Sequence, residues 1–174
     1  MLNKQTTLAV IFILIGVFSR IIPHFENFTA VYAIALFSGT FLKNKQLAFL
    51  LPISIMMCSD LILGFSPSLP TYISFIAIVF VGFLLKRNQK IEHIVFGGVS
   101  ASILFFIITN FFVWINSSPL DGLFYCPKTI HGCIKCYIQA IPFFWNTLFS
   151  TILYSIIIFY TFKFINAKLF AIIK

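Results

Sequence analysis

The sequence predicts an all-α integral membrane protein, folded as a single domain of six transmembrane helices over residues 1–174. Of the 174 residues, 60% are hydrophobic and only 9% are charged, which leaves too little polar surface for a water-soluble domain. The apolar residues also gather in six segments separated by short polar breaks. The net charge of +8 is spread through these breaks, so we expect no basic face for nucleic acid.

The six predicted helices cover residues 6–22, 28–42, 47–64, 70–85, 92–116 and 137–165. About 20 helical residues cross the hydrocarbon core of a bilayer, so the second and fourth segments are short. We expect these two either to extend into their flanks or to pack inside the bundle, where a full span matters less.

The Lys and Arg residues predict the orientation, because the cytoplasmic loops of membrane proteins are enriched in both. With a cytoplasmic N-terminus, nine of the 12 basic residues fall on the cytoplasmic side and three on the outer side. Both termini are then cytoplasmic, and we expect a multi-pass protein of the bacterial cytoplasmic (inner) membrane. The cytoplasmic set is Lys4, Lys43, Lys45, Lys86, Arg87, Lys90, Lys163, Lys168 and Lys174, and the outer set is Arg20, Lys128 and Lys135.

Polar residues in the predicted outer half of the membrane indicate a site. Such residues are costly at membrane depth and usually have a function. Because they come from several helices at similar depth, they predict a substrate pocket that opens outward. The candidate substrate-binding residues are Arg20, His24, Asp60, Tyr72, Asn110, Trp114, Tyr137 and Asn146.

The same residues also have structural interpretations. Asp60 needs a partner at membrane depth, and Arg20 could either pair with it or extend to lipid headgroups. Trp114 and the tyrosines could form an interfacial aromatic belt, and the two asparagines could join helices through hydrogen bonds. His24 could be a solvated loop residue.

Small residues four apart indicate close packing of helices, either inside the bundle or against another membrane subunit. The pairs are Ala35 with Gly39, Gly97 with Ala101, and Gly98 with Ser102.

The last outer loop contains three cysteines and one histidine, namely Cys126, His131, Cys133 and Cys136. Three thiolates and one imidazole suit a zinc site, and Cys133 and Cys136 also have the spacing of a redox dithiol. The outer side of the membrane permits a disulfide. The sequence therefore leaves three roles open for these loop residues: a structural role, a disulfide, and a metal or redox site. No cofactor is expected.

Short motifs along most of the chain resemble a family of small bacterial six-helix membrane proteins, regarded as transport proteins and similar to the substrate-binding S components of energy-coupling-factor (ECF) transporters. The resemblance rests on their order and spacing. The motifs are Ser19-Arg20 with Pro23-His24 and Asn27-Phe28; Leu36-Phe37-Ser38-Gly39; Ser59-Asp60 with Gly64-Phe65; Thr109-Asn110-Phe111 with Trp114; Pro127-Lys128-Thr129 with Gly132; and Cys136-Tyr137, Ala140, Pro142-Phe143-Phe144 and Asn146-Thr147-Leu148.

This resemblance implies an S-component-like bundle whose pocket opens outward, energised by a transmembrane T subunit and two ATPases. The chain departs from the pattern in two places. Phe149 and Ser150 stand where Gly-Asp is expected after Leu148, and the first helix has only Ala9 and Gly16, seven residues apart, where S components often carry Ala-x-x-x-Ala for docking.

Three functions follow from these observations. The first is a non-enzymatic, substrate-binding subunit for uptake of a small molecule, such as a vitamin, a nucleobase-like compound or a corrinoid fragment. The second is a membrane thiol–disulfide oxidoreductase that uses Cys133 and Cys136. The third is a structural subunit of a membrane complex, which would depend on its small residues instead of its polar ones.

Overall fold

The computed structural model of the protein describes residues 4–86 and 88–172, and the side chains of residues 7–86 and 88–165. Arg87 and Lys174 of the predicted cytoplasmic set lie outside the described residues, and the side chains of Lys4 and Lys168 lie outside the described side chains.

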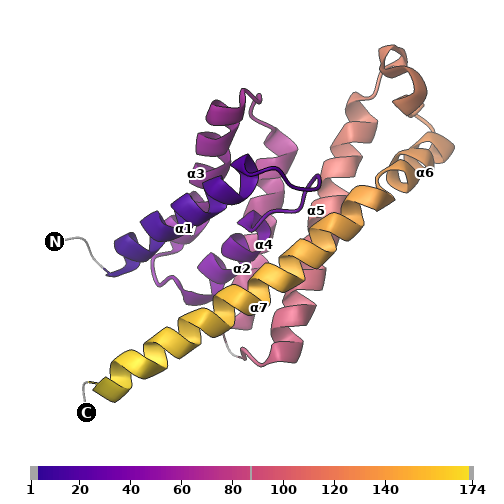
Figure 1. Ribbon diagram of the computed structural model, residues 1–174. Helices are drawn as coiled ribbons and strands as arrows, with labels where there is room; N and C mark the ends of the chain where they lie inside the picture. Colours follow the sequence, from indigo (N-terminus) through magenta and orange to yellow (C-terminus); the bar gives the residue numbers. More distant parts are fainter. Residues whose placement is uncertain (1–3, 87, 173–174) are drawn as a thin grey trace.

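The described residues form helices and no strand, and they confirm the all-helical prediction. The elements are α1 (Lys4–Ile21), α2 (Val31–Phe41), α3 (Lys45–Leu63), α4 (Leu69–Leu85), α5 (Ile91–Asn116), the short 3₁₀ helix η1 (Pro119–Phe124), α6 (Ile130–Gln139) and α7 (Ile141–Ile172). Figure 1 shows them as a bundle in which α7 runs diagonally across the whole molecule, and η1 and α6 project at one end.

Local signals in the sequence set several helix ends. The Asn44 side chain accepts a hydrogen bond from the backbone N–H of Leu47 and so caps α3. Gly64 ends the same helix with φ of 73°, a left-handed conformation that glycine adopts without steric cost. The Thr129 hydroxyl caps α6 by accepting from the N–H of Gly132.

The short helix α2 forms the centre of the bundle. It has 11 residues, about 16 Å of helix, and ten of them are buried. It packs against α1, α3, α4, α5 and α7, so it needs no lipid-facing surface. Of the two alternatives for the second apolar segment, the structure supports packing inside the bundle.

Glycines allow α2 and α4 to approach backbone to backbone. A Cβ atom added at Gly39 would lie 2.2 Å from the Val79 carbonyl oxygen, and one at Gly82 would lie 2.3 Å from the Leu36 carbonyl oxygen. Gly97 faces the Leu85 side chain within the bundle. The described small residues therefore pack against helices of the same chain.

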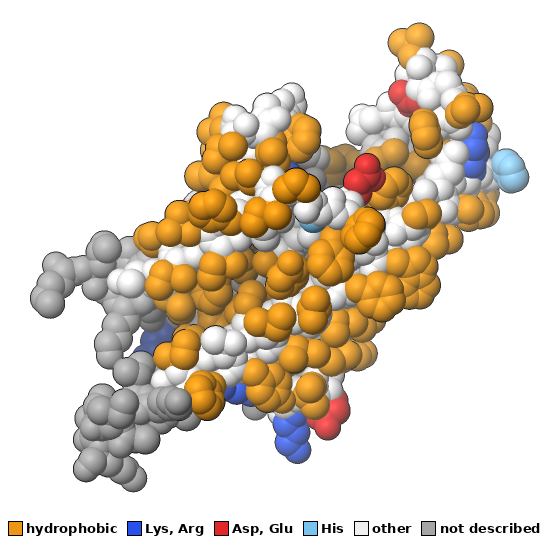
Figure 2. Space-filling view, viewed as in Figure 1, with side chains coloured by type: hydrophobic (Ala, Val, Ile, Leu, Met, Phe, Trp, Pro, Cys, Tyr) orange, Lys and Arg blue, Asp and Glu red, His pale blue; other side chains and the backbone are white. Residues whose placement is uncertain are grey.

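The surface of the bundle is largely apolar. Figure 2 shows one face on which hydrophobic side chains predominate along the helices. Leu61, Leu84 and Phe96 are 80%, 78% and 73% exposed. Among the described residues, α3, α5 and residues Ile141–Ile165 of α7 are long and apolar enough to cross a membrane. An apolar surface of this extent suits lipid and not water, so the molecule is a helical membrane protein.

The last part of the chain differs most from the prediction, and α7 also runs to Ile172, whereas the predicted helix ends at residue 165. The sixth predicted helix, residues 137–165, is interrupted at Ala140, where α6 ends and α7 begins. Pro142 explains the break, because it has no N–H with which to continue the hydrogen bonds of α6. In addition, η1 and α6 occupy the loop before that helix, which the apolar pattern alone does not reveal.

Candidate functional site

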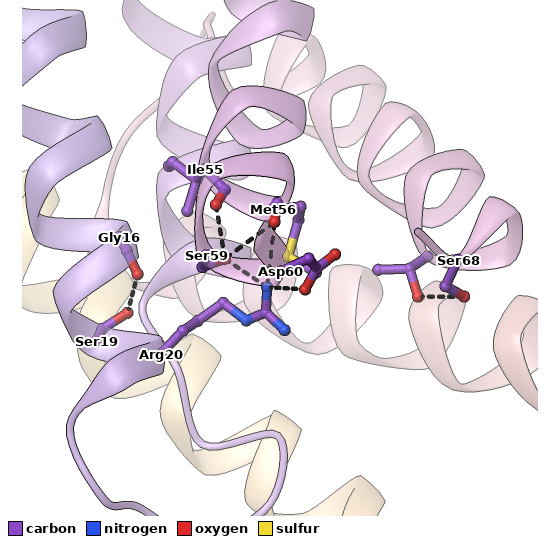
Figure 3. Close-up of polar contacts among 9 residues, drawn as sticks. Gly16, Ser19, Arg20, Ile55, Met56, Ser59, Asp60 and Ser68 are labelled. Atoms are coloured by element: carbon purple, nitrogen blue, oxygen red, sulfur yellow. Dashed lines mark hydrogen bonds and ion pairs between the residues drawn. The ribbon is translucent and has the colours of Figure 1, made fainter. Parts of the chain in front are cut away.

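An ion pair joins α1 to α3 at the end of the bundle where both helices stop, which we call the pocket end. Arg20 Nη1 donates to Asp60 Oδ1 at 2.6 Å and to Ser59 Oγ at 2.5 Å. The Ser59 hydroxyl in turn donates to the Ile55 carbonyl at 2.7 Å. Figure 3 shows the guanidinium reaching from α1 across to the last turns of α3. Of the two alternatives for Arg20, the structure supports the pair.

Two adjoining cavities open at the pocket end, and the first of them lies beside this ion pair. The first has a volume of about 460 Å³ and is bordered by the α1–α2 loop and by side chains of α1 to α5. The second, of about 300 Å³, lies between α4, α5 and α7. Asn27, Thr71 and Phe105 line both cavities, so the two share a wall. Volumes in this range are typical of sites for small organic molecules.

Three aromatic rings form the floor of the first cavity. Tyr32 stacks on Phe75 with ring centroids 5.5 Å apart and meets Phe105 edge-on at 4.8 Å. The Phe75 and Phe105 centroids are 5.9 Å apart, and all three side chains are buried. Packed against one another, the rings offer a rigid apolar surface to a bound ligand.

The polar wall of the first cavity contains charges of both signs. Arg20 lines it directly, whereas Asp60 is 5% exposed and is not among its lining residues. Glu26, in the α1–α2 loop, also lines the cavity and is solvent-exposed. Because Asp60 offsets the charge of Arg20, the Glu26 carboxylate leaves this wall with an excess of negative charge. The pattern of apolar segments does not single out Glu26, since it lies in a loop; its position beside His24 and Asn27 is the only sequence signal.

Hydrogen bonds from α7 hold the loop that carries Glu26. The Asn146 side chain donates to the Glu26 carbonyl at 3.0 Å, and the Ser150 hydroxyl donates to the Asn27 carbonyl at 3.4 Å. Asn27 itself has φ of 63°, a strained conformation for a residue other than glycine. The Ser150 hydroxyl can donate to this carbonyl because it carries an O–H hydrogen.

The remaining predicted site residues separate into two groups. His24 lines the first cavity and Asn110 lines the second, as a pocket interpretation requires. In contrast, Trp114 Nε1 donates to the Pro127 carbonyl at 2.9 Å, and the Tyr137 hydroxyl donates to the Ile107 carbonyl at 2.8 Å.

Neither Trp114 nor Tyr137 lines either of these two cavities, so their role as pocket residues stays a prediction. Trp114 attaches the last loop to α5, and Tyr137 attaches α6 to α5. Tyr72 lines neither cavity, and its hydroxyl is buried with no hydrogen-bond partner among the described residues. Asp60 and Asn146 act through other residues, because they hold Arg20 and the α1–α2 loop in place.

The cysteines and histidine of the last loop do not form a metal site. Cys126 and Cys136 are buried, Cys133 is partly buried, and His131 is exposed. Nowhere in the described part of the chain do three His, Cys, Asp or Glu side chains come together in a way that could hold a metal ion. Burial, with a smaller contribution from the hydrogen bond with Cys126, raises the pKa of the Cys136 thiol to about 12. At neutral pH this thiol is therefore protonated and is a poor nucleophile.

The fold and the site define a helical membrane protein with a polar-walled, aromatic-floored pocket at one end of its bundle. Residues 1–172 match a protein family described as "Family of unknown function (DUF6580)", and the chain belongs to this family. Comparisons with curated proteins and with solved structures gave no match.

Proposed function

We propose that this protein is the substrate-binding membrane subunit of an uptake system for a small molecule of vitamin size. The observation that carries the proposal is the pair of adjoining cavities at the pocket end, with an aromatic floor and a polar wall that includes Arg20 and Glu26. Such a site can hold a flat organic molecule on its apolar face and select its polar edge through hydrogen bonds.

In this proposal the protein spans the bacterial cytoplasmic (inner) membrane six times, with both termini in the cytoplasm and the pocket end outside. The distribution of basic residues supports this orientation. Of the described basic side chains, only Arg20, Lys128 and Lys135 belong to the pocket end, whereas the opposite end carries Lys43, Lys45, Lys86, Lys90 and Lys163. Positive charge on the opposite end favours a cytoplasmic position for that end.

Energy for transport would come from partner subunits. The sequence contains no Gly-x-x-x-x-Gly-Lys-Ser/Thr motif for ATP phosphates. The resemblance to ECF S components implies a transmembrane T subunit and ATPases as partners. Since the Ala-x-x-x-Ala motif is absent from α1, docking to a T subunit would use a different surface from the usual one.

The two alternative functions have less support. A thiol–disulfide oxidoreductase needs an accessible thiolate, and Cys136 is buried with a raised pKa. A purely structural subunit would not need a solvent-connected pocket whose walls carry a charged residue from each of two elements, Arg20 and Glu26.

Native mass spectrometry on gently purified protein tests the proposal. Thr71 lines both cavities, so Thr71→Phe would fill the space they share, whatever the chemistry of the ligand. The matched control is Thr161→Phe, at an exposed position near the opposite end of α7. We expect a small-molecule adduct on the wild type and on Thr161→Phe, and its loss from Thr71→Phe.

Two results would count against the proposal. An adduct retained equally by Thr71→Phe would place the ligand outside the cavities. No adduct on wild-type protein taken directly from its native membrane, and none after incubation with a cell metabolite extract, would contradict a binding subunit.

A further inference from the structure

Two buried cysteines meet at the junction of η1 and α6. Cys126, in the loop after η1, is fully buried, and Cys136, on α6, is 4% exposed. The Cys126 thiol also contributes to the raised pKa of the Cys136 thiol, as a close neighbour would. Cys126 Sγ also lies 3.6 Å from Oε1 of Gln139, which follows Cys136 by three residues and therefore shares its face of α6.

The backbone of this loop lies in close contact with α6. A Cβ atom added at Gly132 would lie 2.0 Å from the Pro127 carbonyl oxygen, so the loop beside Cys126 touches the helix one turn before Cys136. The N–H of Cys126 donates to the Ser117 hydroxyl at 2.9 Å, which anchors the other side of the loop to the end of α5. Cys126 is thus held against the face of α6 that carries Cys136.

The other two cysteines are placed differently. Cys133 is only partly buried and lies on the same helix as Cys136, so a bond between these two would not join separate segments. Cys58 is exposed on α3, far along the chain from the loop.

We propose that Cys126 and Cys136 form a disulfide in the mature protein. The bond forms between their two sulfur atoms as each thiol loses its proton, and two electrons pass to the disulfide of a thiol-oxidising protein outside the membrane, which becomes a dithiol. Oxidation occurs before the loop closes over the sulfurs. The inference rests on the outer position of the pocket end, which is part of the proposed function, and does not depend on uptake.

The disulfide would stiffen one wall of the second cavity. Cys136 Sγ lies 4.0 Å from the carbonyl oxygen of Asn110, and both Asn110 and Ala140, at the end of α6, line that cavity. A link from Cys126 to Cys136 would therefore keep α6 against α5 and limit the opening of this wall.

Peptide mapping distinguishes the pairings, because trypsin cuts after Lys128 and Lys135 and so places the three loop cysteines on three different peptides. Cells would be quenched with acid and N-ethylmaleimide before lysis, so that no thiol oxidises during purification. We expect the peptide ending at Lys128 to be linked to the peptide beginning at Cys136, with Cys133 and Cys58 alkylated. Reduction should separate the two peptides and add the mass of two hydrogen atoms to the intact protein.

Serine variants provide the controls. Cys133→Ser should keep the linked peptides, and Cys126→Ser should leave Cys136 alkylated after denaturation. A link between the peptides of Cys133 and Cys136, or free thiols at both Cys126 and Cys136 in the quenched wild type, would overturn the inference. Neither result would alter the ligand adduct that tests the uptake proposal, so the two can fail separately.

Discussion

Replacing Asp60 with Asn tests the role of the ion pair behind the pocket. The substitution keeps an oxygen that can accept from Arg20 Nη1 but removes the carboxylate charge. The Arg20 and Asp60 side chains are only 15% and 7% exposed, so the guanidinium would remain largely buried without a counter-ion. Removing one partner of a buried pair costs about 3–5 kcal/mol. We expect a loss of about 3 kcal/mol, near the low end, since Arg20 also donates to Ser59 and borders a solvent-connected cavity.

The assay is reversible unfolding of the protein in mixed micelles, followed by circular dichroism, for each single variant and for a double variant. Arg20→Met alone and Asp60→Leu alone should each destabilise the protein as well, because each leaves the other charge buried and unpaired. Arg20→Met combined with Asp60→Leu removes both charges and should recover most of the loss, giving a coupling energy of about 2 kcal/mol or more. Glu92→Gln, at an exposed position on the opposite end, is the control and should change the stability by less than about 0.5 kcal/mol.

Additive effects of the two charge removals would refute this reasoning. A coupling energy near zero would mean that water reaches both side chains and screens them, as in an exposed ion pair. In that case Asp60 would be free to contact a ligand directly, instead of holding Arg20.

Other predictions concern packing, hydrogen bonding and reactivity. Gly39→Ala should destabilise the protein by about 1–3 kcal/mol in the same unfolding assay, because the added methyl group would lie 2.2 Å from a carbonyl oxygen of α4. Gly98→Ala is the control and should have little effect, because its nearest neighbouring atom would lie 3.5 Å from the added methyl group. Tyr137→Phe should cost about 1 kcal/mol for its lost hydrogen bond, and Tyr72→Phe should be neutral or stabilising because its buried hydroxyl has no described partner. In the reduced, folded protein, Cys136 should react slowly with maleimide at neutral pH. Its labelling rate should rise about tenfold per pH unit towards its pKa of about 12, because only the thiolate reacts. Fast labelling at pH 7 would contradict the burial of this thiol.

The sequence predicted the helices well because long apolar runs need no tertiary information. Five of the six predicted segments agree with α1 to α5 to within a few residues. The Arg20–Asp60 pair could also be anticipated, since a carboxylate at membrane depth requires a partner and only one cation was expected at that depth. The predicted start of the sixth helix was wrong, because a single proline divides the apolar run into two helices without changing the hydropathy of that run.

Which residues line the pocket depends more on how the helices pack than on how deep each residue lies in the membrane. Trp114 and Tyr137 lie toward the pocket end, and their polar atoms bind backbone carbonyl groups of the last loop and of α5. Hydropathy specifies how deep a residue lies, whereas the direction of its side chain depends on the rotation of its helix against its neighbours.

The sequence by itself determined that this is a helical membrane protein with charged residues near one end of its bundle, because the composition and periodicity of each segment already carry that information. Only the tertiary structure placed α2 at the centre, joined Tyr32, Phe75 and Phe105 into one floor, and brought Glu26 beside Arg20. Except for Glu26 and Arg20, which are six residues apart, these relations connect residues that are far apart in the chain. They are decided by which helix faces meet, and a single sequence leaves those pairings undetermined.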